Sequence, residues 1–393
     1  MRQPLWNRRE FVQWMGCSSL GTVGLRAAWL PEGKARHTKA TPVFAYVGYG
    51  DRSWQGVQVF AIHGERWSPT QTIASRQPSF LALHPNQRFL YVVNEIDSYR
   101  GLPSGTVEAF AIDPDHGRLT LLNRQPLSLS AIQPRHSAVS PDGRNLVVAV
   151  SGGGAYNVLP IAEDGRLGKV SGIRKEVGSG PNPDHQQASH PLMVIFDPTA
   201  RHLLGADLGS DRLNVFTLAD DKLTLHGRSA TQPGSGPYQI AFHPNSHLLY
   251  VRNELEGSIS CYGYDSANGN VLDRLQHIAI RRDDSQGQRA PGTMAIHPSG
   301  KYLYLSDHRC ETIAGWHINA ATGELAPMES RIDGIGSPHA ITLTPDGNAM
   351  LVLGQKSDSV FRLAIDITSG LLRKPVQIAK LPMTPKCITV KYA

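Results

Sequence analysis

This 393-residue chain has few cysteines and none of the short motifs that mark the common enzyme classes. Three of its four cysteines, Cys261, Cys310 and Cys387, lie beyond the N-terminal region, widely spaced and without a CxxC pair, so they indicate neither a zinc site nor a disulfide framework. The sequence contains no HExxH, GxSxG, Walker or dinucleotide GxGxxG motif, which argues against metalloprotease, serine-hydrolase, nucleotide-binding and Rossmann functions. We therefore expect no metal ion and no cofactor.

Long apolar runs and excess charge are also missing from most of the chain. After the N-terminal region no segment approaches the ~20 apolar residues that a membrane-spanning helix needs. The formal charge of +6 is concentrated in residues 1–40, where seven Lys and Arg residues outnumber two Glu residues, and the remainder has a net charge of only +1. A nucleic-acid-binding domain would carry a basic stripe in its folded body. The sequence therefore predicts neither a membrane span nor a nucleic-acid partner.

The first 40 residues have the layout of a twin-arginine export signal. Arg8 and Arg9 precede Phe11 and a mostly apolar stretch, which Gln13 and Arg26 interrupt. The alternative is a disordered basic tail on a cytoplasmic protein. We expect the export machinery to be a transient partner, the protein to be periplasmic or otherwise extracytoplasmic, and residues 41–393 to form a single monomeric domain.

Seven copies of one short phrase recur along the rest of the chain. In each copy a proline stands six residues before a turn residue, with an apolar run between them. The copies are QPSFLALH (Pro78), QPRHSAVS (Pro134), HPLMVIFD (Pro191), GPYQIAFH (Pro237), APGTMAIH (Pro291), SPHAITLT (Pro338) and TPKCITVK (Pro385). Their regular recurrence, about every 50 residues, is typical of a repeat architecture.

Each repeat has the pattern of four antiparallel strands. In the first six copies a turn rich in Asp, Asn and Gly joins the phrase to a second apolar run, which predicts a hairpin, and two weaker runs follow. Four strands in about 50 residues match a blade of a β-propeller. The seventh copy ends after its first strand, and the opening runs VFAYVGY, GVQVFAI and WSPTQTI can complete it. We therefore predict an all-β, seven-bladed propeller closed by N- and C-terminal strands in one blade, with a six-bladed ring as the alternative.

Functional residues on a repeat scaffold are expected where the copies differ. Antiparallel pairing places the residues beside each proline and those at the end of the second run at the same rim of the ring. Many of these positions are polar, which predicts a polar pocket at the mouth of the channel. The candidates beside the prolines are Gln77, Ser79, Arg135, His136, His190, Tyr238, Gln239, His339 and Lys386, and those at the ends of the second runs are Asn94, Glu95, Ser151, Asp207, Asn253, Glu254, Asp307, His308, Arg309 and Gln355.

Several of these polar residues have a structural explanation. The histidines that repeat at the turn position are structural by this reasoning; they are His84, His243 and His297. Asp207 and Asp211, in the stretch DLGSD, can fix a tight turn through bonds from side chain to backbone, and the same explanation is open for Asn253. Neither Glu254 nor His190 follows from the needs of a hairpin.

Five stretches together carry a resemblance to a known family. They are ASHPLMVIFDP, ADLGSDRLNVF, GPYQIAFHP, YVRNELEGSISCY and YLYLSDHRCETI. Residues 43 to 393 resemble the seven-bladed lactonase family, which contains a bacterial 6-phosphogluconolactonase and fungal carboxymuconate lactonizing enzymes. The resemblance implies a propeller fold, a small-molecule lactone as substrate and hydrolysis of a carboxylic ester.

The chain keeps only part of the family's motifs. Where the family has His-Pro-His, this chain has His190 followed by Pro191 and Leu192, and where it has Gly-Pro-Arg-His this chain has Tyr238 and Gln239 in the last two places. The family's Asn-Glu-Leu is kept as Asn253, Glu254 and Leu255, whereas its Ser-Asn-Arg becomes Ser306, Asp307 and His308, with Arg309 one residue late. These departures put the phosphorylated or tricarboxylate substrate in doubt more than the scaffold.

The resemblance implies roles for the retained residues. Lactone opening needs a base that activates water and a donor that stabilises charge on the carbonyl oxygen. Glu254 is the expected base and His190 the donor or an alternate base, while Arg309 or Arg135 attracts an acidic ligand. The remaining residues expected to bind substrate are His308, His136, Tyr238, Gln239, Asp207 and Asn253. Two alternatives stay open: a non-catalytic exported propeller that binds a ligand or protein, and a muconate-type cycloisomerase.

Overall fold

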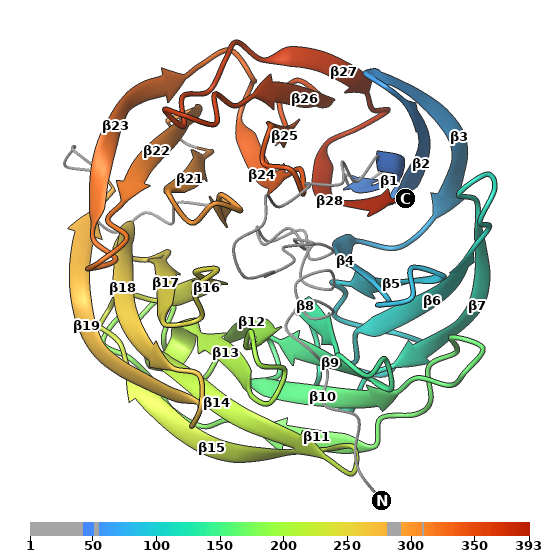
Figure 1. The fold of residues 1–393 in the computed structure, drawn as a ribbon. Helices are drawn as coiled ribbons and strands as arrows, with labels where there is room; N and C mark the ends of the chain where they lie inside the picture. Colours follow the sequence, from blue (N-terminus) through green and yellow to red (C-terminus); the bar gives the residue numbers. More distant parts are fainter. Residues whose placement is uncertain (1–41, 51–54, 281–291, 309) are drawn as a thin grey trace, which may run out of the picture.

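The computed structural model describes residues 42–50, 55–280, 292–308 and 310–393, and within these ranges the chain forms a ring of seven four-stranded antiparallel sheets (Figure 1). The predicted all-β, seven-bladed propeller is therefore confirmed. The one helical element in the described ranges is the three-residue 3-10 helix η1 (Leu208–Ser210), so no helix there is long enough to cross a membrane. The predicted export signal, with Arg8 and Arg9, lies outside the described residues.

The blades are numbered here in the order of the proline copies, and in blades 1 to 6 the strands run outward from the channel in chain order. Blade 1 contains β4 (Pro78–Leu83), β5 (Phe89–Asn94), β6 (Thr106–Ile112) and β7 (Leu119–Pro126). Blade 2 contains β8 (Pro134–Val139), β9 (Asn145–Val150), β10 (Ala155–Pro160) and β11 (Gly172–Lys175). Blade 3 contains β12 (Pro191–Phe196), β13 (Leu203–Asp207), β14 (Arg212–Ala219) and β15 (Lys222–Ala230).

The second half of the chain forms the other blades in the same way. Blade 4 contains β16 (Pro237–Phe242), β17 (Leu248–Asn253), β18 (Ser258–Asp265) and β19 (Asn270–Ala279). Blade 5 contains β20 (Met294–Ile296), β21 (Tyr302–Asp307), β22 (Thr312–Ile318) and β23 (Leu325–Ile332). Blade 6 contains β24 (Pro338–Leu343), β25 (Ala349–Gly354), β26 (Ser359–Ala364) and β27 (Val376–Lys380).

Blade 7 is built from both ends of the chain, as the sequence predicts. Its strands, from the channel outward, are β28 (Pro385–Tyr392), β1 (Pro42–Gly50), β2 (Gln55–His63) and β3 (Arg66–Ala74). The register pairs Val47 of β1 with Ile388 of β28, and β28 contacts both β24 and β4, which closes the ring (Figure 1). Closure protects the edges that a linear array of sheets would leave unpaired.

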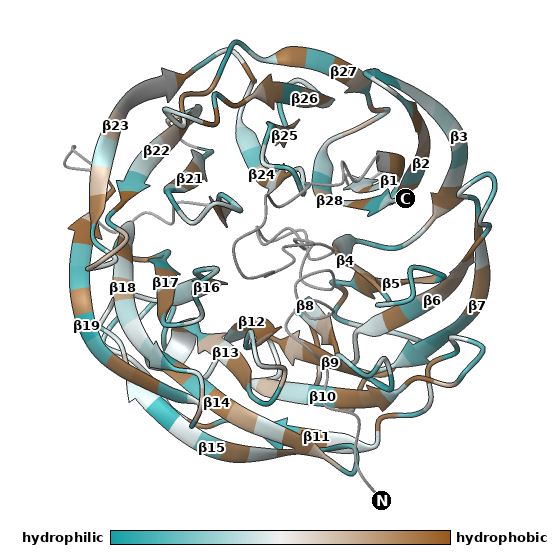
Figure 2. Ribbon diagram, in the orientation of Figure 1, coloured by the Kyte–Doolittle hydropathy of each residue, from teal (hydrophilic) through white to brown (hydrophobic). Residues whose placement is uncertain are grey.

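Hydrophobic packing between neighbouring blades holds the ring together. In the described residues each of the seven interfaces between blades has its own apolar cluster, such as the one that joins Met193 of blade 3 to Ile240 and Phe242 of blade 4. Second strands such as β5 and β17 are fully buried, whereas outer strands such as β7 and β19 are largely exposed and contain both hydrophobic and hydrophilic residues (Figure 2). Each fully buried large apolar side chain contributes about 1.5–3 kcal/mol to folding. Because this burial occurs between blades, one blade alone would lose it and could not be stable.

The turns that join the first two strands lie at one end of the ring, called here the turn rim. Three blades repeat one contact there: the Nε2 atoms of His84, His243 and His297 lie 2.8–2.9 Å from glycine carbonyl oxygens of the next blade. The Nδ1 atom of each ring accepts a backbone N–H two residues further along. Because Nδ1 accepts, Nε2 carries the proton and donates it. Nε2 therefore joins each blade to the next and Nδ1 fixes the turn of its own blade, so both ring nitrogens have the structural role that the repeated position predicts.

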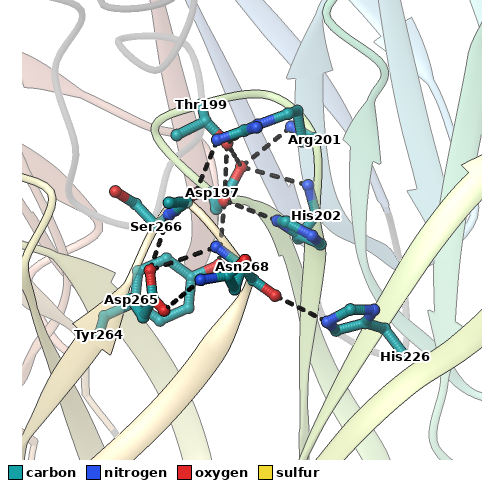
Figure 3. Close-up of polar contacts among 10 residues, drawn as sticks. Asp197, Thr199, Arg201, His202, His226, Tyr264, Asp265, Ser266 and Asn268 are labelled. Atoms are coloured by element: carbon teal, nitrogen blue, oxygen red, sulfur yellow. Dashed lines mark hydrogen bonds and ion pairs between the residues drawn. The ribbon is translucent and has the colours of Figure 1, made fainter.

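Blade 3 replaces this histidine with Asp197, which is fully buried on the turn rim (Figure 3). Its carboxylate accepts hydrogen bonds from the hydroxyl groups of Thr199 and Tyr264, both at 2.9 Å, and lies 3.2 Å from Nδ1 of His202. Tyr264 belongs to β18, so the carboxylate joins blade 3 to blade 4. Burial and the neighbouring Asp197 raise the pKa of Tyr264, which keeps the phenol protonated as a donor.

Candidate active site

A cavity of about 470 Å³ opens where the prolines lie, at the end of the channel called here the cavity rim. All seven blades contribute to its lining. The lining residues are Ser79, Phe80, Glu95, Arg135, His136, Leu192, Tyr238, Glu254, Thr293, His339, Ala340, Gln355, Lys386 and Cys387. Residues far apart in the sequence thus meet at the mouth of the channel, where a propeller can build a concave polar site.

A β-bulge directly after the proline determines which side chains reach the cavity. In blades 1 to 4 and 6 the pairing between the first two strands shifts register at the residue that follows the proline, and β28 shows a shift at the same place. A bulge leaves one residue unpaired and can re-aim its side chain. The residues in this position all line the cavity: Ser79, Arg135, Leu192, Tyr238, His339 and Lys386. Pro291 of blade 5 lies outside the described residues.

Two glutamates reach the cavity from equivalent positions at the ends of second strands. Glu95 follows β5 of blade 1 and Glu254 follows β17 of blade 4, three blades away in the ring (Figure 1). The Glu95 carboxylate forms an ion pair with Arg135 at 3.0 Å. Glu254 is 4% exposed, and its backbone N–H donates to the Gly236 carbonyl at 2.8 Å. The cavity therefore holds one carboxylate tied to an arginine and a second, more deeply buried carboxylate across the channel.

Two histidines that line the cavity are held in the neutral form. Burial lowers the pKa of His136 to about 3, and its ring packs on Phe80 with 3.8 Å between ring centroids. Burial, together with the positive charges of Arg252 and Lys386 among others, lowers the pKa of His339 to about 4. Desolvation and neighbouring cations both disfavour the imidazolium ion. Both rings are consequently uncharged at neutral pH.

His190 and Asp207, expected at the site, do not line the cavity. His190 precedes its proline and the bulge, and its Nδ1 atom lies 3.0 Å from the Ser151 carbonyl oxygen of blade 2. The buried Asp207 carboxylate accepts hydrogen bonds from the hydroxyl groups of Ser189 and Ser210, both at 2.7 Å, and from the backbone N–H of His190. Asp207 thus fixes the turn before β14, in agreement with the structural explanation that its sequence position allows.

Asn253 and Gln239 form hydrogen bonds within the sheets instead of facing the cavity. The Asn253 amide donates to the Ser258 hydroxyl at 2.9 Å. Gln239 bonds both backbone groups of Met294, with its Nε2 atom 2.8 Å from the carbonyl oxygen and its Oε1 atom 2.7 Å from the N–H. These two amides therefore stabilise blade 4 and its contact with blade 5.

The remaining predicted residues divide between the cavity and its surroundings. Arg135, His136 and Tyr238 line it, whereas His308 lies behind His339, with 6.1 Å between ring centroids, and bonds the Ser337 hydroxyl at 2.8 Å. Arg309 lies outside the described residues.

One contributor that sequence reasoning missed is Arg252. Its side chain is 1% exposed, its guanidinium lies 5.2 Å from the centroid of the Tyr238 ring, and it donates to the Gly292 carbonyl oxygen. A signal was available, because the aligned positions of the other second strands hold small or apolar residues. These are Val93, Ala149, Ala206, Ser306, Leu353 and, in blade 7, Gly48. An arginine at an otherwise uncharged buried position indicates a local need for positive charge.

An apolar corner completes the cavity wall beside Glu254. Leu192 packs with Leu208 and Leu255, and the partly buried Tyr238 ring covers them. Within the described part of the chain no three His, Cys, Asp or Glu side chains gather in a way that could hold a metal ion. The described wall of the cavity carries a buried carboxylate, neutral imidazoles and the cations Arg135 and Lys386.

Comparison with known proteins agrees with this architecture. Residues 44–390 match the family described as "Lactonase, 7-bladed beta-propeller". The chain is 26% identical over 357 residues to a 6-phosphogluconolactonase of Bacillus subtilis, which covers 90% of this chain and 97% of that protein. It is 29% identical over 329 residues to a 6-phosphogluconolactonase of Formosa agariphila, covering 81% of this chain and 91% of that protein.

Solved structures show the same likeness. The periplasmic gluconolactonase PpgL of Pseudomonas aeruginosa superposes with a TM-score of 0.79 at 27% identity, covering 89% of this chain and 99% of that structure. The matched region includes all seven repeated prolines and every described residue that lines the cavity. The chain belongs to the seven-bladed β-propeller lactonase family.

Proposed function

We propose that this protein is a lactone hydrolase that opens an acidic or sugar lactone in the cavity, without a metal ion. The observation that carries the proposal is the placement of the buried Glu254 carboxylate in a cavity that also holds Arg135 and Lys386. Relatives named 6-phosphogluconolactonase and gluconolactonase support the reaction class.

Glu254 is the general base in this proposal. A carboxylate can take a proton from a water molecule as that water attacks the lactone carbonyl carbon. Arg135 and Lys386 lie on blades 2 and 7, on the other side of the ring from Glu254, where they can attract a negatively charged substituent of the substrate. His190 does not line the cavity, and its Nδ1 atom contacts the Ser151 carbonyl oxygen, so it has a supporting and not a catalytic role in this proposal.

We further propose that the protein acts outside the cytoplasm. The Arg8-Arg9 pair before an apolar stretch supports export, as does the likeness to a gluconolactonase named periplasmic. An exported enzyme would meet sugar or aromatic lactones rather than phosphorylated intermediates of the cell interior. Fractionation of cells that express the full chain, compared with the Arg8→Lys, Arg9→Lys variant, tests this, since retention of both in the cytoplasm would contradict export.

Turnover of a lactone panel tests the reaction. We expect the purified protein to hydrolyse at least one of glucono-δ-lactone, its 6-phosphate and dihydrocoumarin above the spontaneous rate, in the presence of a chelator. Glu254→Gln keeps the size of the side chain and removes the base, so it should lower kcat/KM by about 10³-fold or more. Wild-type rates equal to the blank for every lactone would contradict the proposal.

A non-catalytic binding propeller is the main competing hypothesis. The apolar corner of Leu192 and Tyr238 favours it, because the family motifs have polar residues at these two positions. Binding of a lactone without turnover, measured by calorimetry, would support a binding protein. Ring closure of an unsaturated diacid would instead support the hypothesis of a muconate-type cycloisomerase.

A further inference from the structure

We propose that His339 is a second catalytic residue of this site: a neutral hydrogen-bond donor that stabilises the negative charge formed on the lactone carbonyl oxygen while Glu254 acts as the base. This inference rests on the proposed lactone-hydrolase function. It concerns a residue that lies outside the family motifs found in the sequence.

The fold holds His339 firmly in the cavity wall. It is the residue after Pro338 at the start of β24, where the bulge directs side chains into the cavity. Its backbone carbonyl accepts a hydrogen bond from the Ser306 hydroxyl at 3.0 Å. Behind the ring lies His308, which the buried Ser337 hydroxyl fixes at 2.8 Å. A donor that is fixed before the substrate arrives costs no reorganisation during the reaction.

The imidazole has hydrogen-bonding capacity that the protein does not use. Among the described residues the buried Nδ1 atom of His339 has no hydrogen-bond partner. No acceptor therefore holds the proton there, and the neutral ring can carry its N–H group on Nε2. By contrast, the structural histidines of the turn rim, such as His297, use both ring nitrogens within the protein. A buried polar group without a hydrogen-bond partner lowers the stability of the fold. Such a group in a native protein therefore points to a role in binding or catalysis.

The charges around His339 suit a donor better than a base. Burial lowers its pKa to about 4, and His308, Arg252, Lys386 and Arg135 add to this effect. A ring with so low a pKa is a weak base at neutral pH, but it is uncharged and keeps one N–H group. The cations Arg252, Lys386 and Arg135 create a positive field, which favours negative charge developing beside the ring.

The reaction can then be followed atom by atom. Glu254 takes one proton from water, the water oxygen bonds to the carbonyl carbon, and the carbonyl π electrons move to the carbonyl oxygen, which accepts the hydrogen bond from His339. When this oxyanion re-forms the carbonyl, the ring C–O bond breaks and the leaving oxygen takes the proton back from Glu254. The product is a hydroxy acid that loses its carboxyl proton to solvent. His339 keeps its proton throughout.

Two substitutions at one position separate a donor from a base. His339→Ala removes the N–H group and should lower kcat/KM for the best lactone of the panel by about 10²–10³-fold, the loss typical for one oxyanion donor. His339→Gln keeps an N–H donor in a side chain of similar length and should retain activity within about tenfold of wild type. The pH dependence of kcat/KM between pH 5 and 8 should keep its shape in both variants. His297→Gln, on the turn rim, is the matched control and should leave kcat/KM unchanged.

Each alternative outcome has a distinct reading. Equal losses in His339→Ala and His339→Gln, with the acidic limb of the pH profile displaced, would show that His339 is a base and would overturn the donor role. Full activity in both variants would remove His339 from the reaction while leaving the lactone-hydrolase function intact. Absence of turnover by the wild-type protein would overturn the function and this inference together. Circular dichroism and thermal melts confirm that each variant is folded.

Discussion

Histidines at the two rims of the ring have opposite surroundings. On the turn rim the ring of His243 accepts a backbone N–H at Nδ1 and donates from Nε2 to the Gly300 carbonyl oxygen at 2.8 Å. On the cavity rim the buried Nδ1 atom of His339 has no hydrogen-bond partner among the described residues. The residue type is the same, and what differs is whether the protein itself provides hydrogen-bond partners for both ring nitrogens.

The carboxylates at the two rims also differ in their surroundings. Asp197 on the turn rim has its oxygens occupied by hydroxyl and backbone donors from blades 3 and 4 (Figure 3). Glu254 stands in the wall of a cavity large enough for a small molecule. A polar group that is enclosed by its own protein stabilises the fold, whereas one in the wall of a cavity can also meet a ligand. Substitutions on the turn rim should therefore change stability, and those on the cavity rim should change activity.

The largest effect is expected at the saturated carboxylate. Asp197→Ala leaves the Tyr264 and Thr199 hydroxyl groups and the His202 ring without their acceptor in a buried place. We expect a loss of about 3–5 kcal/mol in the free energy of unfolding, measured by urea denaturation. The folded fraction should keep wild-type kcat/KM. An unchanged midpoint of urea denaturation would show that a carboxylate with many hydrogen bonds inside the protein is not needed for stability.

A smaller effect is expected when a cavity arginine is removed. Arg135→Gln should lower kcat/KM for a negatively charged lactone by about 10–100-fold and for glucono-δ-lactone by less than about threefold, because only the charged substrate uses the guanidinium. Arg228→Gln is the matched control, since Arg228 also pairs with a glutamate, Glu176, but does not line the cavity. Its activity should stay unchanged. Equal losses for both lactones would contradict the role of Arg135.

Loss of one histidine contact between blades should be milder still. His243→Leu keeps the size of the side chain but removes both hydrogen bonds, and it leaves the Gly300 carbonyl without its donor. We expect about 1–2 kcal/mol of destabilisation and unchanged kcat/KM. Denaturation and initial rates measured on the same preparation check this. A loss of activity at full stability would break the distinction between the rims.

The smallest effect is a pH dependence of stability that comes from the cavity histidines. The pKa of His339 is about 4 in the folded protein, below the ordinary value of 6.5, so the unfolded chain binds a proton that the folded chain does not. Stability from this source is complete above pH 6.5 and is lost as the pH falls toward 4. In His339→Gln the free energy of unfolding should fall less as the pH is lowered, by about 1 kcal/mol at pH 6, and urea titrations at several pH values measure this. An identical slope in variant and wild type would contradict the neutral state.

Much of the fold could be predicted from the sequence because the same pattern of strands and turns recurs along the chain. The proline copies and the second apolar runs gave the strands, and the incomplete seventh copy together with VFAYVGY predicted the closure that β28 and β1 form. The histidines of the turn rim were predictable for the same reason, since His84, His243 and His297 occupy one repeated position.

The candidate site was only partly predictable, because one residue of displacement decides which side chain faces the channel. His190 and Arg135 both flank a proline, but Arg135 follows it, in the bulge, and lines the cavity, whereas His190 precedes it and bonds Ser151. Period-two alternation cannot locate a bulge. The buried position of Arg252 beneath Tyr238 likewise depends on how blades 4 and 5 pack.

The sequence by itself determined the number of blades, their antiparallel strands and the shared closing blade, because local turn chemistry and apolar periodicity are repeated in every copy. Only the tertiary structure decided which polar side chains line the cavity and which form hydrogen bonds within the blades instead. That choice depends on interactions between residues far apart in the sequence, such as the effect of Arg135 in blade 2 on His339 in blade 6, and no local pattern records them. Long-range packing therefore decides which members of a repeated position are free to act on a ligand.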